Sequence, residues 1–206
     1  MFKGGDKMRF IKIPVIFALA FFTASCFVTS IHPLYTEKDL TFAPELLGTW
    51  KTEDEEDIYT FKQSGKDAYE LIITGQESSK KPIDSLGYDE AGRYEAHLVK
   101  LGKFLFLDIY PQVPEMEEYG VDIHLIPVHS FYKIWIEKDV IRLVSLDYDW
   151  LEEMVDKKKV NIAHIRLEDR IILSAPTDEL QKFVLRYAED KEAFYEIEEL
   201  HRQEQN

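Results

Sequence analysis

Cysteine is almost absent from this chain of 206 residues, which contains only Cys26. A disulfide joins two cysteines, so none can form within one chain. A catalytic thiol is also not expected, because Cys26 directly follows a segment in which a cleavage point is expected rather than an active site. The role of the single cysteine must therefore come from the residues around it.

The chain also lacks an apolar run long enough to span a membrane. The run IPVIFALAFF at residues 13–22 would, as a helix, cover only about 15 Å of a hydrocarbon core about 30 Å thick. Basic residues precede this run, and Ala24 and Ser25 follow it. This layout is typical of a secretory signal peptide, which we predict to occupy residues 1–25.

Basic residues are few relative to acidic ones. The chain has 25 Lys and Arg against 39 Asp and Glu, which gives a net charge of −14 at pH 7. Loss of residues 1–25 removes four basic residues and one acidic residue, which makes the net charge −17. Such a domain repels nucleic acid and anionic lipid surfaces, so no nucleic-acid partner is expected. The electrostatic partner that it favours is a basic protein.

No motif of a common catalytic site occurs in the sequence: no Gly-rich phosphate loop, no Gly-x-Ser-x-Gly and no His-Glu-x-x-His. Asp122, His124 and His129 suggest a metal site, but His129 is an odd number of residues from His124 and would point to the other face of a strand. His97 and His164, each flanked by apolar residues, are expected to be interior histidines held by hydrogen bonds. We therefore predict no metal site, no bound cofactor and no catalytic residue.

Two acidic features have open interpretations. The turn Glu53–Asp57 could bind a cation or could be an ordinary solvated turn. Asp108, within the run FLFLDIY, is a candidate buried carboxylate for which the sequence identifies no partner. Neither feature supports a mechanism.

Residues 23–26, Thr-Ala-Ser-Cys, resemble the lipobox of bacterial lipoproteins, with Thr23 where that signal usually has Leu. The resemblance implies that the Cys26 thiol receives a diacylglyceryl group, that the chain is cut before Cys26, and that the new N-terminus is acylated. It implies a bacterial cell-envelope protein anchored in a membrane by lipid, with residues 26–44 as a tether. Phe27 rather than Asp follows the cysteine, which favours the periplasmic face of the outer membrane in a host with two membranes. The alternative is a secreted protein in which Cys26 has no role.

Short β-like runs alternate with turn signals from Leu46 onward, and they predict eight or nine mostly antiparallel strands. Polar turns at residues 64–67 and 101–103 are hairpin signals. Several runs are apolar on both faces, as in FLFLDIY, where Leu107 and Phe106 face opposite ways. Such strands need cover on both faces, which helices, a second sheet or a barrel interior provide.

Three segments instead show helical patterns. A start that resembles a capping box predicts a helix near residues 149–158. Pro176, followed by apolar residues at helical spacing, predicts a second helix. The spacing of Phe194, Ile197 and Leu200 predicts a third.

The stretch Gly48-Thr49-Trp50 at the start of the first long strand resembles the Gly-x-Trp signature of the lipocalin and calycin barrels. In that family the Trp closes one end of an eight-stranded antiparallel barrel, and a helix after the last strand packs on its outside. An Arg near the last strand is a further family element, for which Arg166 and Arg170 are both candidates.

The predicted fold class is therefore mainly β with added helices (β+α). We expect an antiparallel eight- to nine-stranded lipocalin-like barrel or a strongly curved sheet. A single globular domain would occupy residues 45–206, with the strands and the inserted helix in 45–174. Residues 175–206 would form C-terminal helices packed outside.

A barrel of this kind predicts a small-molecule binder that holds an apolar ligand such as a lipid or fatty acid. The alternative function is an interaction or assembly module of the envelope that uses its acidic surface against a basic protein, and an enzyme is a third class. Six residues are candidates for the lining of the ligand cavity: Trp50, Tyr69, Tyr94, Phe106, Tyr132 and Trp135. Each of them could instead be an ordinary member of a filled core.

Overall fold

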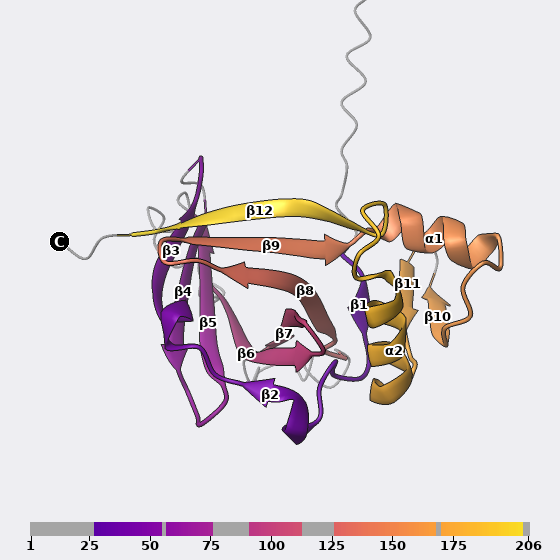
Figure 1. Ribbon diagram of the computed structural model, residues 1–206, viewed down its shortest axis with the longest axis horizontal. Helices are drawn as coiled ribbons and strands as arrows, with labels where there is room; N and C mark the ends of the chain where they lie inside the picture. Colours follow the sequence, from indigo (N-terminus) through magenta and orange to yellow (C-terminus); the bar gives the residue numbers. More distant parts are fainter. Residues whose placement is uncertain (1–26, 55–56, 76–90, 113–125, 168–169, 204–206) are drawn as a thin grey trace, which may run out of the picture.

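The computed structural model describes residues 27–54, 57–75, 91–112, 126–167 and 170–203, and Figure 1 shows how its strands and helices are arranged. In chain order the elements are β1 (Thr29–Ser30), η1 (Glu37–Asp39), β2 (Leu40–Thr41), η2 (Pro44–Leu46), β3 (Gly48–Thr52), β4 (Asp57–Gln63), β5 (Tyr69–Gly75), β6 (Gly92–Leu101), β7 (Phe104–Pro111), β8 (His129–Ile136), β9 (Val140–Leu146), α1 (Tyr148–Asp156), β10 (His164–Leu167), β11 (Arg170–Leu173), α2 (Thr177–Tyr187) and β12 (Phe194–Arg202).

Eight of the strands form a closed antiparallel barrel. Each strand from β3 to β9 pairs with the next one along the chain, and β12 pairs with β9 on one side and with β3 on the other. Outside the barrel, β1 pairs with β8 and β11, β10 pairs with β11, and β2 pairs with β6. The predicted mainly β fold with an antiparallel barrel is confirmed.

The strand β12 stands where the sequence predicted a third helix. Its residues pair with β9 from Phe194 to His201 and with β3 from Leu200 to Arg202. Phe194 is buried outside the barrel, and Leu200 is buried inside it. Without β12 both β3 and β9 would leave an open sheet edge, and this pairing outweighs the helix propensity of the Glu-rich sequence.

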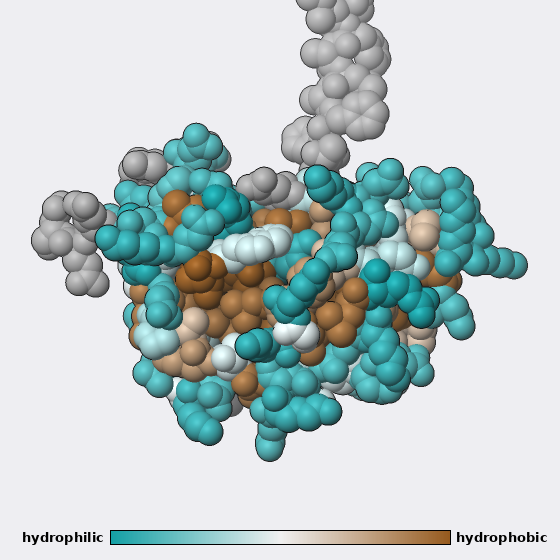
Figure 2. All heavy atoms as spheres, in the orientation of Figure 1, coloured by the Kyte–Doolittle hydropathy of each residue, from teal (hydrophilic) through white to brown (hydrophobic). Residues whose placement is uncertain are grey.

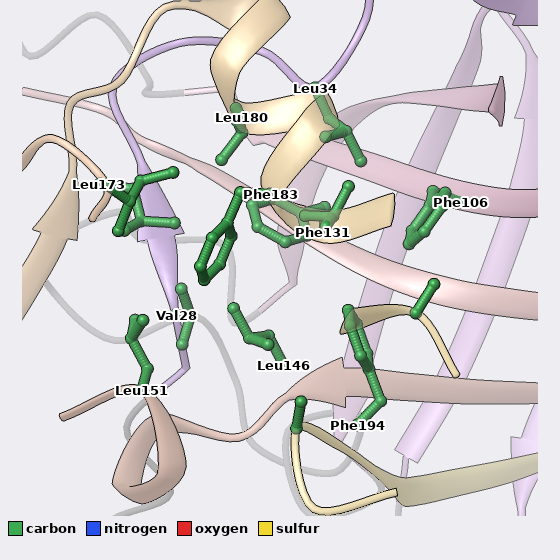
Figure 3. Packing of buried hydrophobic residues seen from close by; sticks show 14 of the residues in the cluster. Val28, Leu34, Phe106, Phe131, Leu146, Leu151, Leu173, Leu180, Phe183 and Phe194 are labelled. Atoms are coloured by element: carbon green, nitrogen blue, oxygen red, sulfur yellow. The ribbon is translucent and has the colours of Figure 1, made fainter. Parts of the chain in front are cut away.

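Side chains that alternate along the barrel strands belong to two different cores. Leu71, Leu107 and Ile134 lie in the barrel interior. Phe106 and Phe131, on the opposite face of their strands, lie in an outer core. Figure 3 shows this outer core, in which side chains of α2 meet those of the barrel wall.

Two helices pack against the outer core. α1 begins after Asp147, whose carboxylate accepts a hydrogen bond from Trp150 N at 2.6 Å, and this confirms the predicted inserted helix. α2 follows Pro176, as predicted. Lys133 on β8 donates a hydrogen bond to Ala188 O at the end of α2, at 2.7 Å, which fixes the helix to the barrel wall. No helix in the described part of the chain is long and apolar enough to cross a membrane.

The segment predicted as a tether, residues 26–44, belongs to the folded domain from Val28 onward. Val28 and Leu34 are buried in the outer core. β1 and β2, which this segment contributes, pair with strands of the barrel. The packed domain therefore begins within two residues of Cys26.

On the face drawn in Figure 2, hydrophobic residues gather in the middle and hydrophilic residues surround them. Exposed hydrophobic side chains that are scattered singly are normal and do not by themselves mark a binding site. The large ones among the described residues are Phe27, Ile126, Trp135, Ile165, Leu167, Leu185 and Tyr195.

Candidate functional site

Trp50 and Arg202 close one end of the barrel, which we call the base. Trp50 is fully buried, and its Nε1 donates a hydrogen bond to Leu46 O at 2.9 Å. The guanidinium group of Arg202 stacks on the indole ring, 4.0 Å from its centroid. Arg202 also donates to Leu47 O at 3.0 Å. A planar cation can both stack on an aromatic face and bind carbonyl groups, so this one side chain fastens the last strand to the start of β3.

Gly48 of the Gly-x-Trp stretch is required by this arrangement. Its φ is +120°, a conformation that other residues adopt only with strain. A Cβ atom on Gly48 would lie 3.0 Å from Nη1 of Arg202. The glycine therefore leaves space for the guanidinium group.

The arginine of the base is Arg202, so the prediction of Arg166 or Arg170 was wrong. Arg166 lies on β10 and pairs with Glu152 at 3.0 Å and Asp156 at 2.6 Å. The error follows from the missed strand. Because β12 was taken for a helix, β11 appeared to be the last strand, and the arginine was sought beside it.

An eight-stranded antiparallel barrel with this base is consistent with a calycin-like fold. Comparisons with protein-family models, with curated proteins and with solved structures found no match for the chain. A fold alone does not determine a function, so the function must be inferred from the site.

Four of the six predicted lining residues lie in the barrel interior. Trp50 and Tyr69 are fully buried in the packed base, where the Tyr69 hydroxyl accepts a hydrogen bond from Ala43 N at 2.7 Å. Tyr94 and Tyr132 are partly buried against the same interior core. Of the six, Tyr132 is the one that lines an internal cavity.

The other two predicted lining residues are not in the interior. Phe106 is fully buried, but in the outer core, and Trp135 is 43% exposed on the outer wall. Successive residues of a strand face opposite ways, and Leu107 and Ile134 beside them point inward. The alternation therefore excludes Phe106 and Trp135 from the lining, once Leu107 and Ile134 are seen to point inward.

The cavity has a volume of about 60 Å³ and lies on the side of the interior away from the base. Along the inner face of β12, Arg202 is at the base, Leu200 is in the middle and Glu198 is at the cavity. We call the end of the barrel at which Glu198 and the cavity lie the mouth. The walls of the cavity are mainly apolar and consist of Phe27, Tyr59, Leu71, Ile73, Leu107, Ile109, Tyr132, Leu143 and Glu198.

Sequence reasoning missed most of these lining residues for two reasons. The alternation separated the two faces of each strand without showing which face is inward, and the selection of candidates favoured aromatic side chains. Glu198 gave no usable signal, because its segment was taken for a helix. A carboxyl group on an inward face of a barrel becomes visible only once β12 is recognised as a strand.

Glu198 and Tyr59 form a polar pair in the wall of the cavity. The Tyr59 hydroxyl donates a hydrogen bond to Glu198 Oε2 at 2.7 Å. Burial raises the pKa of Glu198, the hydrogen bond from Tyr59 lowers it, and the carboxylates of Asp57 and Asp54 raise it, with a net upward shift. Burial and the neighbouring Glu198 also raise the pKa of Tyr59, so its hydroxyl keeps its proton and remains a donor at neutral pH.

Glu198 also borders a hollow on the surface, which we call the acidic bay. The bay has a volume of about 400 Å³ and is lined by Thr52, Glu53, Asp54, Glu198 and Glu199. Glu53 and Asp54 belong to the acidic turn that the sequence marked as a cation site or a solvated turn, of which residues 55 and 56 lie outside the described part of the chain. Glu198 is the residue shared by the bay and the cavity.

Asp108 has buried partners that the sequence did not reveal. It is 1% exposed, its Oδ2 accepts a hydrogen bond from Leu34 N at 2.8 Å, and its Oδ1 lies 2.7 Å from His129 Nδ1. Nearby, the rings of Tyr35 and His97 are in contact, with centroids 4.5 Å apart and planes tilted by 35°. These contacts fasten the N-terminal segment to the outer wall of the barrel.

This cluster is structural rather than catalytic. Ser30 is the cross-strand partner of His129, but its hydroxyl accepts a hydrogen bond from His32 N at 3.3 Å and no bond joins it to the imidazole. Ser30, His129 and Asp108 are all buried. A nucleophile needs a base within hydrogen-bond reach and access for a substrate, and these three residues provide neither.

The remaining predictions about histidines and metals have different outcomes. His97 is buried, as predicted. His164 lies on β10, all of whose residues are exposed, so the interior position predicted for it was wrong. Apolar neighbours do not reveal that a strand lies at the edge of a sheet. Asp122 and His124 lie outside the described residues, among which no group of three or more His, Cys, Asp and Glu could hold a metal ion.

His97 should make the domain less stable at acid pH. Burial lowers its pKa below 6.5, although Glu95 and Asp108 act in the opposite direction and His129 adds to the lowering. The unfolded chain therefore binds the proton more readily, and stability is lost as the pH falls from about 6.5 through the folded-state pKa. In urea denaturation at pH 7.5 and 5.5, His97→Gln should lose less stability on acidification than the wild type. The exposed control His32→Gln should behave as the wild type, and an unchanged pH dependence in His97→Gln would show that His97 is not responsible.

Proposed function

We propose that this protein is a lipid-anchored protein of a bacterial cell envelope whose barrel binds a small apolar ligand. The observation that carries the proposal is the apolar cavity between the packed base and the mouth. Pockets with apolar walls and a few polar groups are the usual form of small-molecule sites. The Thr-Ala-Ser-Cys stretch supports attachment through Cys26, and we place the domain at the periplasmic face of the outer membrane in a host with two membranes.

The size of the cavity limits the ligand. Pockets for drug-sized ligands have volumes of roughly 300–1,000 Å³, whereas this cavity has about 60 Å³. A whole lipid or a long fatty acid does not fit in that space. We therefore propose that the buried part of the ligand is a short alkyl chain or a single ring.

Filling the cavity should abolish binding of a short apolar probe. Leu107 lies in the cavity wall, and Leu107→Phe would place additional carbon atoms there. We expect 1-hexanol to bind the wild type in a calorimetric titration and to bind Leu107→Phe at least ten-fold more weakly. The control Leu185→Phe makes the same change at an exposed position of α2 and should bind as the wild type does.

Circular dichroism and thermal melting would verify that both variants are folded. Absence of hexanol binding to the wild type would contradict the proposed function. Equal binding to all three proteins would contradict the assignment of the cavity as the site.

The acidic bay favours a second candidate function, a module that binds a basic protein. The bay has four carboxyl groups among its lining residues, and such a surface is complementary to Lys-rich or Arg-rich partners. Crosslinking of the anchored protein in its own envelope tests this candidate. A single stoichiometric basic partner would support it.

A further inference from the structure

We propose that the ligand of the cavity is a short-chain amine, whose alkyl part fills the apolar cavity and whose ammonium group binds Glu198. This inference rests on the proposed function and specifies its ligand. The cavity and the acidic bay meet at Glu198, which lines both. An amphiphile with one small apolar part and one cationic part matches that pair of neighbouring spaces.

The position of Glu198 fits the role of an ammonium acceptor. It is the one carboxyl group in a wall whose other side chains are aliphatic or aromatic. Its Oε2 is held by the Tyr59 hydroxyl at 2.7 Å. A carboxylate accepts more than one hydrogen bond, so it can take one from an ammonium group while Tyr59 keeps it in place. Charge-assisted bonds of this type are stronger than bonds between neutral groups.

The charges around Glu198 leave its own charge uncompensated. No Lys, Arg or His of the described residues pairs with Glu198, whose polar contact is Tyr59. The next residue, Glu199, is different, because Arg142 Nε donates to it at 3.2 Å. Burial and the nearby acids raise the pKa of Glu198, which means that the site disfavours its negative charge. A bound ammonium group would relieve this cost, and a bound carboxylate would increase it.

The carboxylates around the cavity and the bay disfavour a short fatty acid as the ligand. A fatty acid that placed its alkyl chain in the cavity would bring its carboxylate beside Glu198 and toward Glu53 and Asp54. Like charges at such distances repel one another. A neutral alcohol would avoid repulsion but would gain no charge-assisted bond. The expected order of affinity is therefore amine, then alcohol, then carboxylate.

Three probes of equal chain length test this order: hexylamine, 1-hexanol and hexanoate, titrated at pH 7.5 by calorimetry. We expect hexylamine to bind the wild type at least about ten-fold more tightly than 1-hexanol, as a charge-assisted bond implies. Hexanoate should bind most weakly. Because all three titrations use the wild type, the comparison does not depend on the folding of a variant.

Two variants assign the effect to one residue. Glu198→Gln keeps the size of the side chain and its ability to accept from Tyr59, and it should reduce hexylamine affinity about ten-fold or more while 1-hexanol affinity stays within about two-fold. Glu37→Gln removes one negative charge at an exposed position that lines neither the cavity nor the bay, and it should leave the preference for the amine intact. Lowering the pH should weaken hexylamine binding to the wild type, because protonation of Glu198 removes the ionic acceptor.

The outcomes separate the two proposals. If 1-hexanol or hexanoate binds the wild type as tightly as hexylamine, or if Glu198→Gln keeps the amine preference, the amine inference is wrong and the cavity remains a site for apolar ligands. If 1-hexanol does not bind the wild type, the proposed function fails, and the amine inference, which rests on it, fails with it.

Discussion

Replacing Trp50 with alanine should lower the free energy of unfolding by about 3–5 kcal/mol, the range observed when large buried aromatic side chains are truncated. The indole is fully buried at the base of the barrel. Its removal would leave a cavity, would leave Leu46 O without its donor, and would take from Arg202 the ring on which it stacks. The loss therefore combines packing, a buried unsatisfied carbonyl group and an exposed face of the guanidinium group.

Urea denaturation followed by circular dichroism measures this effect. Trp135→Ala is the matched control, because it truncates the same side chain on the outer wall, where Trp135 is 43% exposed. The control should change the free energy of unfolding by less than about 1 kcal/mol. Equal effects of the two substitutions would contradict the role of Trp50 as the closure of the base.

Cys26→Ser should move the protein from the membrane fraction to the soluble fraction and abolish palmitate labelling. The proposed attachment is covalent lipid on Cys26, and the substitution removes the only thiol in the chain. More than one acyl chain is needed for stable anchoring, and the acidic domain offers no electrostatic replacement on an anionic membrane. The expected change is close to complete.

Fractionation of cells that express each form, with labelled palmitate, gives the measurement. Thr23→Leu is the control, since it introduces the usual lipobox residue and should preserve both membrane retention and labelling. Retention of Cys26→Ser in the membrane without label would show that the domain is held there by something other than lipid.

Most of the strands, and the division of each strand into two faces, were predictable from local sequence. Alternation along a strand has a period of two, and it separated Leu107 from Phe106 and Ile134 from Trp135. It did not reveal which face is inward, and Phe106 and Trp135 were wrongly taken for lining residues. The inserted helix and α2 were also predictable, because a cap or a proline marks each start. These features depend on residues close together in the chain.

The last barrel strand and the site that it supplies depend on contacts between distant residues. Leu200 pairs with Thr52 of β3 and with Ile141 of β9, and neither pairing leaves a trace in the local sequence. Arg202 at the base and Glu198 at the mouth come from this same strand. One local error, a helix in place of β12, therefore removed both the closing arginine and the carboxyl group of the candidate site.

Binding in the cavity can be observed most directly by nuclear Overhauser effects between hexylamine and the methyl groups of the isotope-labelled protein. We expect contacts from the alkyl chain to the methyl groups of Leu71, Leu107 and Leu143, which line the cavity. Contacts confined to exposed residues such as Leu167 and Leu185, or no contacts at all, would contradict a ligand site inside the barrel.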